Sequence, residues 1–389
     1  MFSFFTSQQA STFTSTRPNI HVRIPNDVST FNPKEYPNVV FKAEGRLSGE
    51  VHVVHGGQES DKSGKAVVTS QIYVTQESDK EKVRITPTLE NGVYTIFMEG
   101  PRFEFGHPIY HDTTIEYPRD IQSVDSLTVT APSTSLNGSA DLRNLAFRTH
   151  LSSQLSNGHV CFENADAELV RLHTTNGSIS GVYKAGHVEL QSTNGGISSK
   201  LALRDAADGQ QSRVATTTTN GTVDIHATAV ETTRGLWMEN GSSNGRVTIA
   251  ALVGKASLAS VLKIHSTNGR VDLNADLSQS NQPAEVSATT TSSLIGASVM
   301  VPREQLFKGL FHSTNSGVQV NLTEDFYGNF KVETTNSHAN VEGSELVLEH
   351  SKNTSKQGHR GEGPSTVDVH STNGSANLRF FPAGQSLAA

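Results

Sequence analysis

The sequence predicts an all-β protein built from one short unit that is stacked many times along a single axis. Two observations lead to this prediction. An asparagine recurs ten times in the same frame, with Ser or Thr two residues before it in nine copies, Gly directly after it in eight and an aliphatic residue three residues later in all ten. Hydrophobic residues make up only 34% of the chain and aromatic residues 6%, which suits a narrow core. A repeat of this kind decides the architecture before any other signal does.

The repeated frame begins after the first third of the chain. Its asparagines are Asn137, Asn157, Asn176, Asn194, Asn220, Asn244, Asn268, Asn315, Asn336 and Asn373. Most neighbouring copies lie 18 to 26 residues apart, and the longest gap, from Asn268 to Asn315, is 47 residues. This gap divides into two ordinary units if residues 288–297 are a copy that lost its asparagine near Ser293.

Each unit has the pattern of a strand, a tight turn and a second strand. Counting from the asparagine, positions +3 and +5 are mostly apolar and position +4 is mostly polar, so a period of two buries +3 and +5 and exposes +4. Glycine at +1 supplies a positive φ angle. Asn-Gly then forms either the turn of a β-hairpin or the corner of a coil, with the amides of successive coils hydrogen-bonded as a ladder. The regular spacing over about eleven units favours coils.

Strand patterns also precede the repeats. β-Branched and aromatic residues alternate with polar ones at 49–54, 66–74, 82–85, 93–98 and 127–129, which indicates antiparallel strands. The predicted parts of the chain are a disordered Ser/Thr-rich tail at 1–20, an N-terminal β-rich domain or cap at 21–125, a repeat domain at 126–382 with a flexible insert at 351–363, and a second tail at 383–389. A cap is expected because an open end of a stack exposes a sheet edge.

The runs Thr-Thr-Asn-Gly-Ser-Ile at 174–179 and Ser-Thr-Asn-Gly-Arg-Val-Asp-Leu at 266–273 resemble the units of an adhesin-like β-solenoid repeat domain of unknown function. That domain occurs in the head domains of bacterial autotransporter adhesins and in related fungal proteins. The resemblance covers about residues 125–380 and rests on a short motif. It implies a right-handed β-helix-like solenoid without established catalytic residues. Residues 1–120 are most similar to the N-terminal region of the fungal members.

The composition limits which classes of partner and which cellular compartment are expected for this protein. A net charge of −7 and a pI of about 6.1 argue against a nucleic-acid partner, because such proteins show a basic face. Cys161 is the only cysteine, so no internal disulfide forms. No stretch approaches the ~18 apolar residues of a membrane helix, and the first residues lack the pattern of a signal peptide. We therefore expect a cytoplasmic protein without a transmembrane segment, with the cell surface as the alternative.

Asn-Gly-Ser or Asn-Gly-Thr, a form of the acceptor pattern for N-glycosylation, occurs at five asparagines. They are Asn137, Asn176, Asn220, Asn240 and Asn373. We interpret them as turn residues, and glycans on Asn176 or Asn220 would instead indicate export.

Histidine recurs three residues before the frame asparagine, at His173, His265, His312 and His370. Such a column could hold a metal ion. The closest members, His265 and His312, are expected two coils apart, or roughly 9.6 Å at the spacing of neighbouring strands. Zinc ligands lie about 2.0–2.1 Å from the ion, so we interpret the column as exposed polar residues and predict no metal or cofactor site.

Asp224 and Asp272 share position +4, also two coils apart. Their expected separation borders on the ~6.5–9.5 Å between the carboxylates of inverting glycosidases. The alternative function is therefore a carbohydrate-active β-helix enzyme, a polysaccharide hydrolase or lyase. Trp237 is the only tryptophan, so aromatic sugar subsites are not indicated. We interpret the two aspartates, and Cys161 in the same column, as surface residues and predict no catalytic residue.

Four basic side chains, Lys352, Lys356, His359 and Arg360, lie in the expected insert. We interpret them as a solvated loop rather than a surface for an acidic partner. Together these patterns predict a non-enzymatic repeat protein that presents a polar Ser/Thr/Asn-rich surface for adhesion or scaffolding, with an unidentified protein or glycan as its partner.

Overall fold

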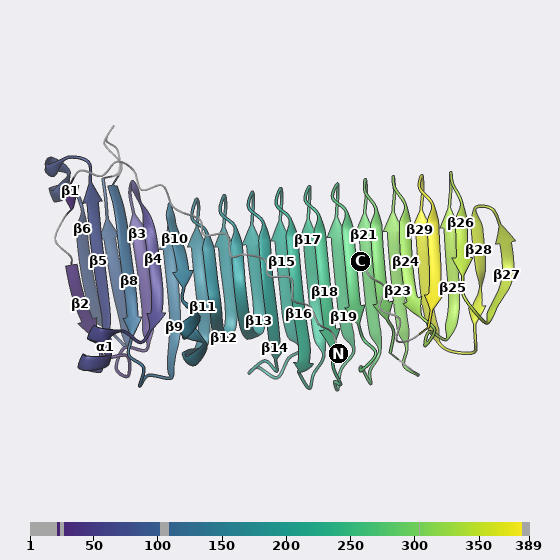
Figure 1. Ribbon diagram of the computed structural model, residues 1–389, viewed down its shortest axis with the longest axis horizontal. Helices are drawn as coiled ribbons and strands as arrows, with labels where there is room; N and C mark the ends of the chain where they lie inside the picture. The colour runs from purple at the N-terminus through teal and green to yellow at the C-terminus, as the bar shows by residue number, and fades with distance from the viewer. Residues whose placement is uncertain (1–21, 24–26, 102–108, 303, 383–389) are drawn as a thin grey trace.

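A computed structural model describes residues 22–23, 27–101, 109–302 and 304–382 of the chain (Figure 1). The expected tails at 1–20 and 383–389 lie outside these residues. The prediction of an all-β protein is confirmed, because the described residues contain thirty strands joined in one sheet. The sheet is folded so that its strands form two stacks, which face each other along an elongated molecule.

We call the two sets of strands stack A and stack B. In spatial order, stack A contains β6 (Arg84–Glu90), β7 (Val93–Glu99), β3 (Asn38–Glu44), β9 (Ser123–Ala131), β11 (Ala146–Leu155), the second halves of β12 (Val160–Thr174) and β13 (Ile179–Ser192), β15 (Ser212–Thr218), β17 (Leu236–Ser242), β19 (Ser260–Ser266), β21 (Ala284–Thr290), β23 (Phe307–Ser313), β29 (Ser365–Ser371), β25 (Gly328–Thr334), β28 (Ser355–Arg360) and β27 (Leu346–Lys352).

Stack B begins with the short β1 (Val22–Arg23) and β2 (Asp27–Phe31), which both pair with β5. It continues with β5 (Ala66–Val74), β8 (Ile109–Tyr117), β4 (Leu47–His55), β10 (Thr134–Gly138), the first halves of β12 and β13, β14 (Ile197–Arg204), β16 (Val223–Glu231), β18 (Val247–Val253), β20 (Val271–Asp276), β22 (Ile295–Met300), β24 (Val318–Thr323), β30 (Ala376–Phe381) and β26 (Ala339–Glu342). Three short helices complete the described elements: α1 (Gln58–Ser63), η1 (Glu77–Lys82) and η2 (Ala140–Asn144).

The core lies between the two stacks and follows the inward columns that the sequence indicates. Position +3 is buried in nine of the ten frames, as in Val247 and Val271, which are both 0% exposed. The exception is Ala140, which is exposed in η2. Because each coil contributes a few side chains to a strip of apolar contacts, 34% hydrophobic residues suffice for a long molecule.

The Asn-Gly segments turn the chain from one stack to the other. β19 pairs with β17 and β21, whereas β20, which follows the Asn268 corner, pairs with β18 and β22. The strands on the two sides of this corner do not pair with each other, so it is not a hairpin turn.

The amides of these corners form a hydrogen-bonded ladder. The Nδ2 of Asn244 donates to the Oδ1 of Asn220 at 2.8 Å, and the Nδ2 of Asn268 donates to the Oδ1 of Asn244 at 2.8 Å. The same contact joins Asn157, Asn176, Asn194 and Asn220 in series, and again Asn315, Asn373 and Asn336. The ladder gives each coil a polar contact in addition to its backbone pairing.

The unit that lacks asparagine agrees with the expectation, and one other position of the frame does not. Ser292, adjacent to Ser293, occupies the ladder position in the unit that lacks asparagine, because its N–H donates to Thr267 O at 3.0 Å. Asn137 lies inside β10 opposite Cys161 and is not a corner. Ser133 takes that corner and accepts a hydrogen bond from Asn157 Nδ2 at 3.2 Å. The short frame thus matched Asn137 by chance, since its +3 residue is not buried.

The gap at Ser292 leads to a stability prediction. Ser292→Asn is expected to connect the two halves of the ladder and to stabilise the protein by about 1 kcal/mol, whereas Asn244→Ala is expected to cost about 1 kcal/mol by removing two amide contacts. Denaturant unfolding measures both changes. Ser293→Asn is the matched control, because residue 293 follows the corner position; an equal gain from this variant would contradict the assigned register.

The N-terminal part continues the same stacks. β3, β4 and β9 pair in parallel with both stack neighbours, so the expectation of antiparallel strands is wrong for the predicted segments in β4 and β9. It is correct for β5, which pairs antiparallel with β1, β2 and β8, and for β6, which pairs antiparallel with β7. β7 also pairs in parallel with β3. β9 also runs across the expected boundary at 125/126. The sequence pattern could not separate these cases, because parallel and antiparallel strands alternate with the same period.

The C-terminal coils do not stack in sequence order. β29 lies between β23 and β25, and β30 lies between β24 and β26, so the last coil of the chain sits one step inside the end of the array (Figure 1, yellow). The expected flexible insert at 351–363 is wrong as a loop, because most of it belongs to the antiparallel hairpin of β27 and β28. This hairpin pairs with β25 and extends stack A.

Candidate functional site

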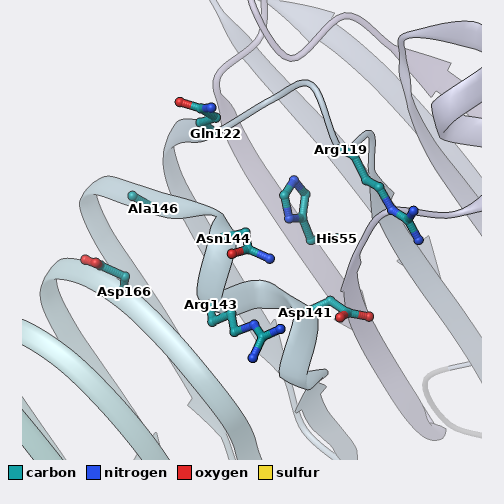
Figure 2. Close-up of a pocket in the computed structure, with 8 residues that line it drawn as sticks. All are labelled: His55, Arg119, Gln122, Asp141, Arg143, Asn144, Ala146 and Asp166. Atoms are coloured by element: carbon teal, nitrogen blue, oxygen red, sulfur yellow. The ribbon is translucent and has the colours of Figure 1, made fainter.

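A polar pocket lies where the N-terminal strands meet the first regular coils. Its volume is about 700 Å³. Figure 2 shows the lining residues His55, Arg119, Gln122, Asp141, Arg143, Asn144, Ala146 and Asp166. They come from the end of β4, the loop between β8 and β9, the helix η2, the first residue of β11 and the middle of β12. The helix η2, which connects β10 of stack B to β11 of stack A, contributes three of the lining residues.

The base of the pocket contains a histidine of fixed tautomer. His55 is 5% exposed, and its Nε2 lies 2.9 Å from the carbonyl oxygen of Ile121. A carbonyl only accepts, so Nε2 donates and Nδ1 of the neutral ring keeps its lone pair. Figure 2 shows the ring among the other lining side chains. This nitrogen can accept a hydrogen bond from a hydroxyl group.

The charges around the pocket are mixed. Arg119 donates its backbone N–H to Asp61 at 2.8 Å, and its Nε lies 3.5 Å from the same carboxylate. Asp166 pairs with Arg204 Nη1 at 2.6 Å. Arg143 forms neither a hydrogen bond nor an ion pair with the part of the chain that the structure describes. Arginine, aspartate and amide groups together suit a ligand with several hydroxyl groups and a carboxylate.

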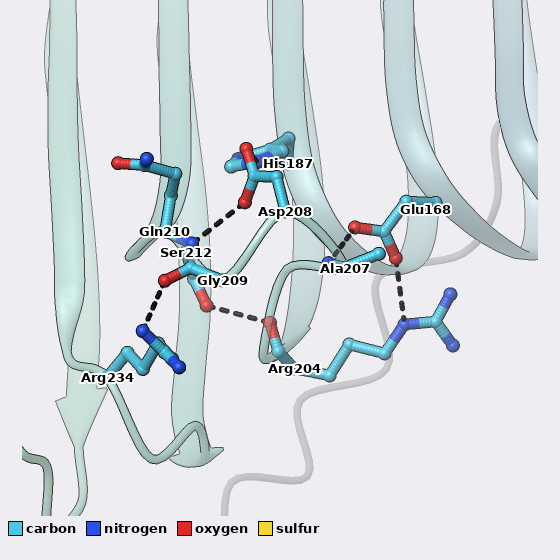
Figure 3. Close-up of polar contacts among 9 residues, drawn as sticks. All are labelled: Glu168, His187, Arg204, Ala207, Asp208, Gly209, Gln210, Ser212 and Arg234. Carbon is cyan, nitrogen blue, oxygen red and sulfur yellow. Dashed lines mark hydrogen bonds and ion pairs between the residues drawn. The ribbon is translucent and has the colours of Figure 1, made fainter.

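A second polar cluster fixes the loop between β14 and β15 (Figure 3). Glu168 Oε1 accepts from the N–H of Ala207 at 2.6 Å, and its other oxygen lies 4.0 Å from Arg204 Nε. Ser212 Oγ donates to the carbonyl of Arg204 at 2.7 Å. These groups are used within the chain, so they hold the loop against the stack.

The same loop is fixed at its middle by Asp208 (Figure 3). Its Oδ1 accepts from the N–H of Gln210 at 2.8 Å, and its Oδ2 lies 3.3 Å from His187 Nε2. The hydrogen bond from Gln210, followed by that from His187, lowers the pKa of this exposed carboxyl. We interpret the cluster as a structural clamp, because its charged groups already have partners.

The structure changes the geometry of the histidine column. His312 and His370 lie on adjacent strands with their ring centroids 4.7 Å apart and their planes at 29°. The expectation that His265 and His312 are the closest pair is wrong, because the coil of β29 and β30 is inserted beside His312. Burial and then the neighbouring His370 lower the pKa of His312, whereas Asp368 raises it. Within the described residues, no group of three or more His, Cys, Asp or Glu side chains could hold a metal ion.

The two aspartates of position +4 lie two strands apart, with Thr248 between them. Each has its own partner. Asp272 contacts Arg246 Nε at 2.7 Å and Arg270 Nη2 at 2.7 Å, and Asp224 lies 3.5 Å from His226 Nε2. The structure thus places the two aspartates in one column, as the sequence indicates. It also pairs each of them with basic side chains that the repeated frame does not predict.

Among the remaining sequence candidates, Cys161 lies in the same column as Asp224, as expected, because the register runs from Cys161 through Ser180 and Ser198 to Asp224. Cys161 is an exposed free thiol in the first part of β12. Lys356 donates to Ser351 Oγ at 2.7 Å within the β27–β28 hairpin, and His359 lies 3.3 Å from Glu349. Arg360 is only 3% exposed, so the interpretation of all four basic residues as solvated is wrong for this one.

The pocket residues were missed at the sequence level. They come from five segments that span more than one hundred residues, and only Asp141, at position +4 of the Asn137 frame, belongs to the repeated frame. The available signal was indirect. The frame at Asn137 is followed by polar residues instead of a buried strand, which marks an irregular coil, but the sequence does not show that this irregularity meets His55 and Arg119.

One buried histidine gives a pH prediction. His111 in β8 is 0% exposed, with Nε2 at 2.9 Å from Thr134 Oγ1 and Nδ1 at 3.2 Å from Thr113 Oγ1. Burial lowers the pKa of His111 to about 3. The folded state therefore binds fewer protons than the unfolded state below the ordinary pKa of ~6.5. Stability contributed by this group is complete above pH 6.5 and is lost as the pH falls towards 3.

The expected size of this effect is about 2 kcal/mol between pH 7 and pH 5. Denaturant unfolding at a series of pH values gives the free energy of unfolding of the wild type and of His111→Gln. In His111→Gln, the part of the pH dependence that comes from His111 is expected to disappear. A variant that keeps the wild-type slope would contradict the assignment, whatever its absolute stability.

No family model matches the chain, and no curated protein matches it either. Among solved structures, it is similar to a candidate cell adhesion protein from Clostridium sporogenes, with 7% identity over 92% of this chain and 99% of that one and a TM-score of 0.19. It is also similar to candidate adhesins from Parabacteroides merdae, with 10% identity over 76% and 95% and a TM-score of 0.35, and from Bacteroides fragilis, with 10% identity over 76% and 96% and a TM-score of 0.31. These low TM-scores mean that the chains do not superpose as wholes.

No helix among the described residues is long and apolar enough to cross a membrane.

Proposed function

We propose that this chain is a non-enzymatic adhesion or scaffolding protein that presents a polar Ser/Thr/Asn-rich surface along its stacked strands. The observation that supports this most is the constant spacing of outward columns. One column on stack B runs through Ser180, Ser198, Asp224, Thr248, Asp272, Gly296, Gln319, Asn377 and Asn340. Neighbouring strands lie about 4.8 Å apart, so the column offers small polar groups at regular intervals.

The proposed partner is a polymer whose own polar groups repeat along a line, either a glycan or a repetitive protein. A rigid surface with regular spacing can contact many units of such a polymer at once, and the weak individual contacts add through multivalency. The pocket of Figure 2 supports a glycan, since His55 offers an acceptor and Arg143 a cation to hydroxyl and carboxylate groups.

We further propose that the two stacks are wound as a right-handed β-helix-like solenoid. Successive strands of one stack are joined by a strand of the other, as β19 and β21 are joined through β20. Crossovers between parallel strands are right-handed in about 98% of cases. An experimental density map with a left-handed path would contradict this proposal.

A cytoplasmic location remains a proposal as well. It is supported by the free thiol of Cys161 and by the state of the formal glycan acceptors, since Asn240 is 0% exposed and the amides of Asn176 and Asn220 are engaged in the ladder. Subcellular fractionation with intact-mass analysis tests this. A glycan on Asn176 or Asn220 would contradict it.

Binding to immobilised glycans and to proteins from a lysate tests the proposed function. Thr248→Arg places a large cation in the stack B column and is expected to reduce binding at least tenfold. Thr289→Arg makes the same change on stack A and is the matched control. The proposal fails if neither variant changes the binding of any captured partner. It also fails if the purified protein turns over a polysaccharide and the double variant Asp224→Asn, Asp272→Asn abolishes that activity.

A further inference from the structure

The last coil of the chain fills a slot between two earlier ones. β29 has β23 on one edge and β25 on the other, and β30 has β24 and β26. Among the described strands, β25 and β26 form no pairing with β23 and β24. Without residues 365–381, four strand edges would therefore lose their partners.

The slot is also apolar on its inner side. Val367, Val369, Ala376, Leu378 and Phe380 of the inserted coil are between 0% and 3% exposed. The ladder is continuous through the slot, since Asn373 bonds to Asn315 and to Asn336. The slot thus binds this segment in three ways: by strand pairing on both sides, by apolar contacts in the core and by the asparagine ladder at the corner.

A short hinge connects the inserted coil to the hairpin before it. Arg360 and Ser365 both lie opposite Gly328, on its two sides, so residues 361–364 reverse the chain across two strand spacings, or about 10 Å. Gly361 has a φ of +56°, and a Cβ there would lie 2.5 Å from the ring of Tyr327. A Cβ on Gly363 would lie 2.3 Å from the carbonyl oxygen of Tyr327. The closed hinge therefore requires both glycines.

We propose that the β29–β30 coil exchanges between two copies of this chain, with each copy inserting its coil into the slot of the other. The slot of a second copy is chemically identical, so the pairings, the apolar contacts and the ladder are all re-formed, and only the hinge changes. An extended hinge reaches about 16 Å, which places the C-terminal ends of the two copies side by side. The coil meets the slot of its own chain at an effective concentration in the mM range. Insertion into the slot of a second chain competes with this, so exchange is favoured when chains fold together at high protein concentration.

Two single-cysteine variants test the exchange. Both carry Cys161→Ser; one adds Lys308→Cys and the other Thr366→Cys, because these exposed residues pair across β23 and β29. Strands about 4.8 Å apart are within the range of a disulfide. After the two variants are mixed, unfolded together, refolded at high concentration and oxidised, disulfide-linked heterodimers are expected, with a yield that rises with protein concentration.

The matched control replaces Thr366→Cys by Glu285→Cys. Glu285 also pairs with Lys308, but both residues precede the hinge, so this mixture is expected to give only background heterodimer. In the otherwise native chain, Gly363→Val is expected to raise the dimer fraction roughly tenfold, because the overlap with Tyr327 penalises only the closed hinge. Gly64→Val is its control, since Gly64 has a φ of +64° but no atom within 4 Å of an added Cβ. The proposal is overturned if the Lys308/Thr366 mixture gives no more heterodimer than the Glu285 control, with the native hinge and with Gly363→Val.

Discussion

Val271→Asp is expected to abolish the cooperative unfolding transition of the repeat region. Val271 is 0% exposed and lies between Val247 and Ile295 in stack B. An unpaired carboxylate in this strip costs at least about 4 kcal/mol. Because each coil contacts only its neighbours, the break also uncouples the coils on its two sides. Circular dichroism during denaturant unfolding, combined with hydrogen exchange of the separate coils, measures both effects.

The control is the next residue along the chain. Asp272→Ala removes contacts with Arg246 and Arg270, and those side chains are 56% and 49% exposed. Screening by solvent limits the loss to about 1 kcal/mol. This is more than the near-silent change that an isolated surface residue would give. Similar losses from Val271→Asp and Asp272→Ala would contradict the assignment of inward and outward positions.

Arg360→Met is expected to destabilise the C-terminal end by on the order of 3 kcal/mol. The guanidinium donates to the carbonyl oxygens of Glu324, Phe326 (3.1 Å) and Ser344 (3.2 Å). It also lies over the ring of Tyr327 at 5.4 Å. Methionine fills a similar volume but leaves three carbonyl oxygens without this donor, and the connection from β24 to β25 loses its main support.

Hydrogen exchange measures this change directly. The amide protection of residues 324–360 is expected to fall, whereas the amide protection of the stack A strands that precede β23 is expected to stay unchanged. Arg379→Met is the control. Arg379 is exposed in β30, so its replacement is expected to change stability by less than about 0.5 kcal/mol. Equal effects of the two variants would show that Arg360 contributes only as a surface charge.

The sequence predicted the local unit well because its period of two is a direct consequence of strand geometry. The burial of Val247 and Val271 followed from their spacing to the frame asparagine. The order of the coils did not follow, because every coil presents similar edges and similar apolar columns. Nothing in the frame around Asn373 distinguishes a terminal coil from one that sits between Asn315 and Asn336.

The candidate sites were less predictable for the same physical reason. His312 and His370 became neighbours only through the order of stacking, and Asp272 received its two arginines from a neighbouring coil and from its own. The pocket at His55 depends on η2, which interrupts the repeat. Contacts between coils and irregular insertions are properties of the assembled stack, whereas the frame describes one coil at a time.

The position of the last coil has a consequence for synthesis on the ribosome. Chains grow from the N-terminus, and their parts fold as they emerge. The strands from β25 to β28 leave the ribosome before β29 and β30, the coil against which they rest. The end of the array therefore lacks these two pairing strands until residues 365–381 have emerged. A nascent chain that stalls before Ser365 carries a finished N-terminal array and an end that chaperones can recognise by its unpaired strands.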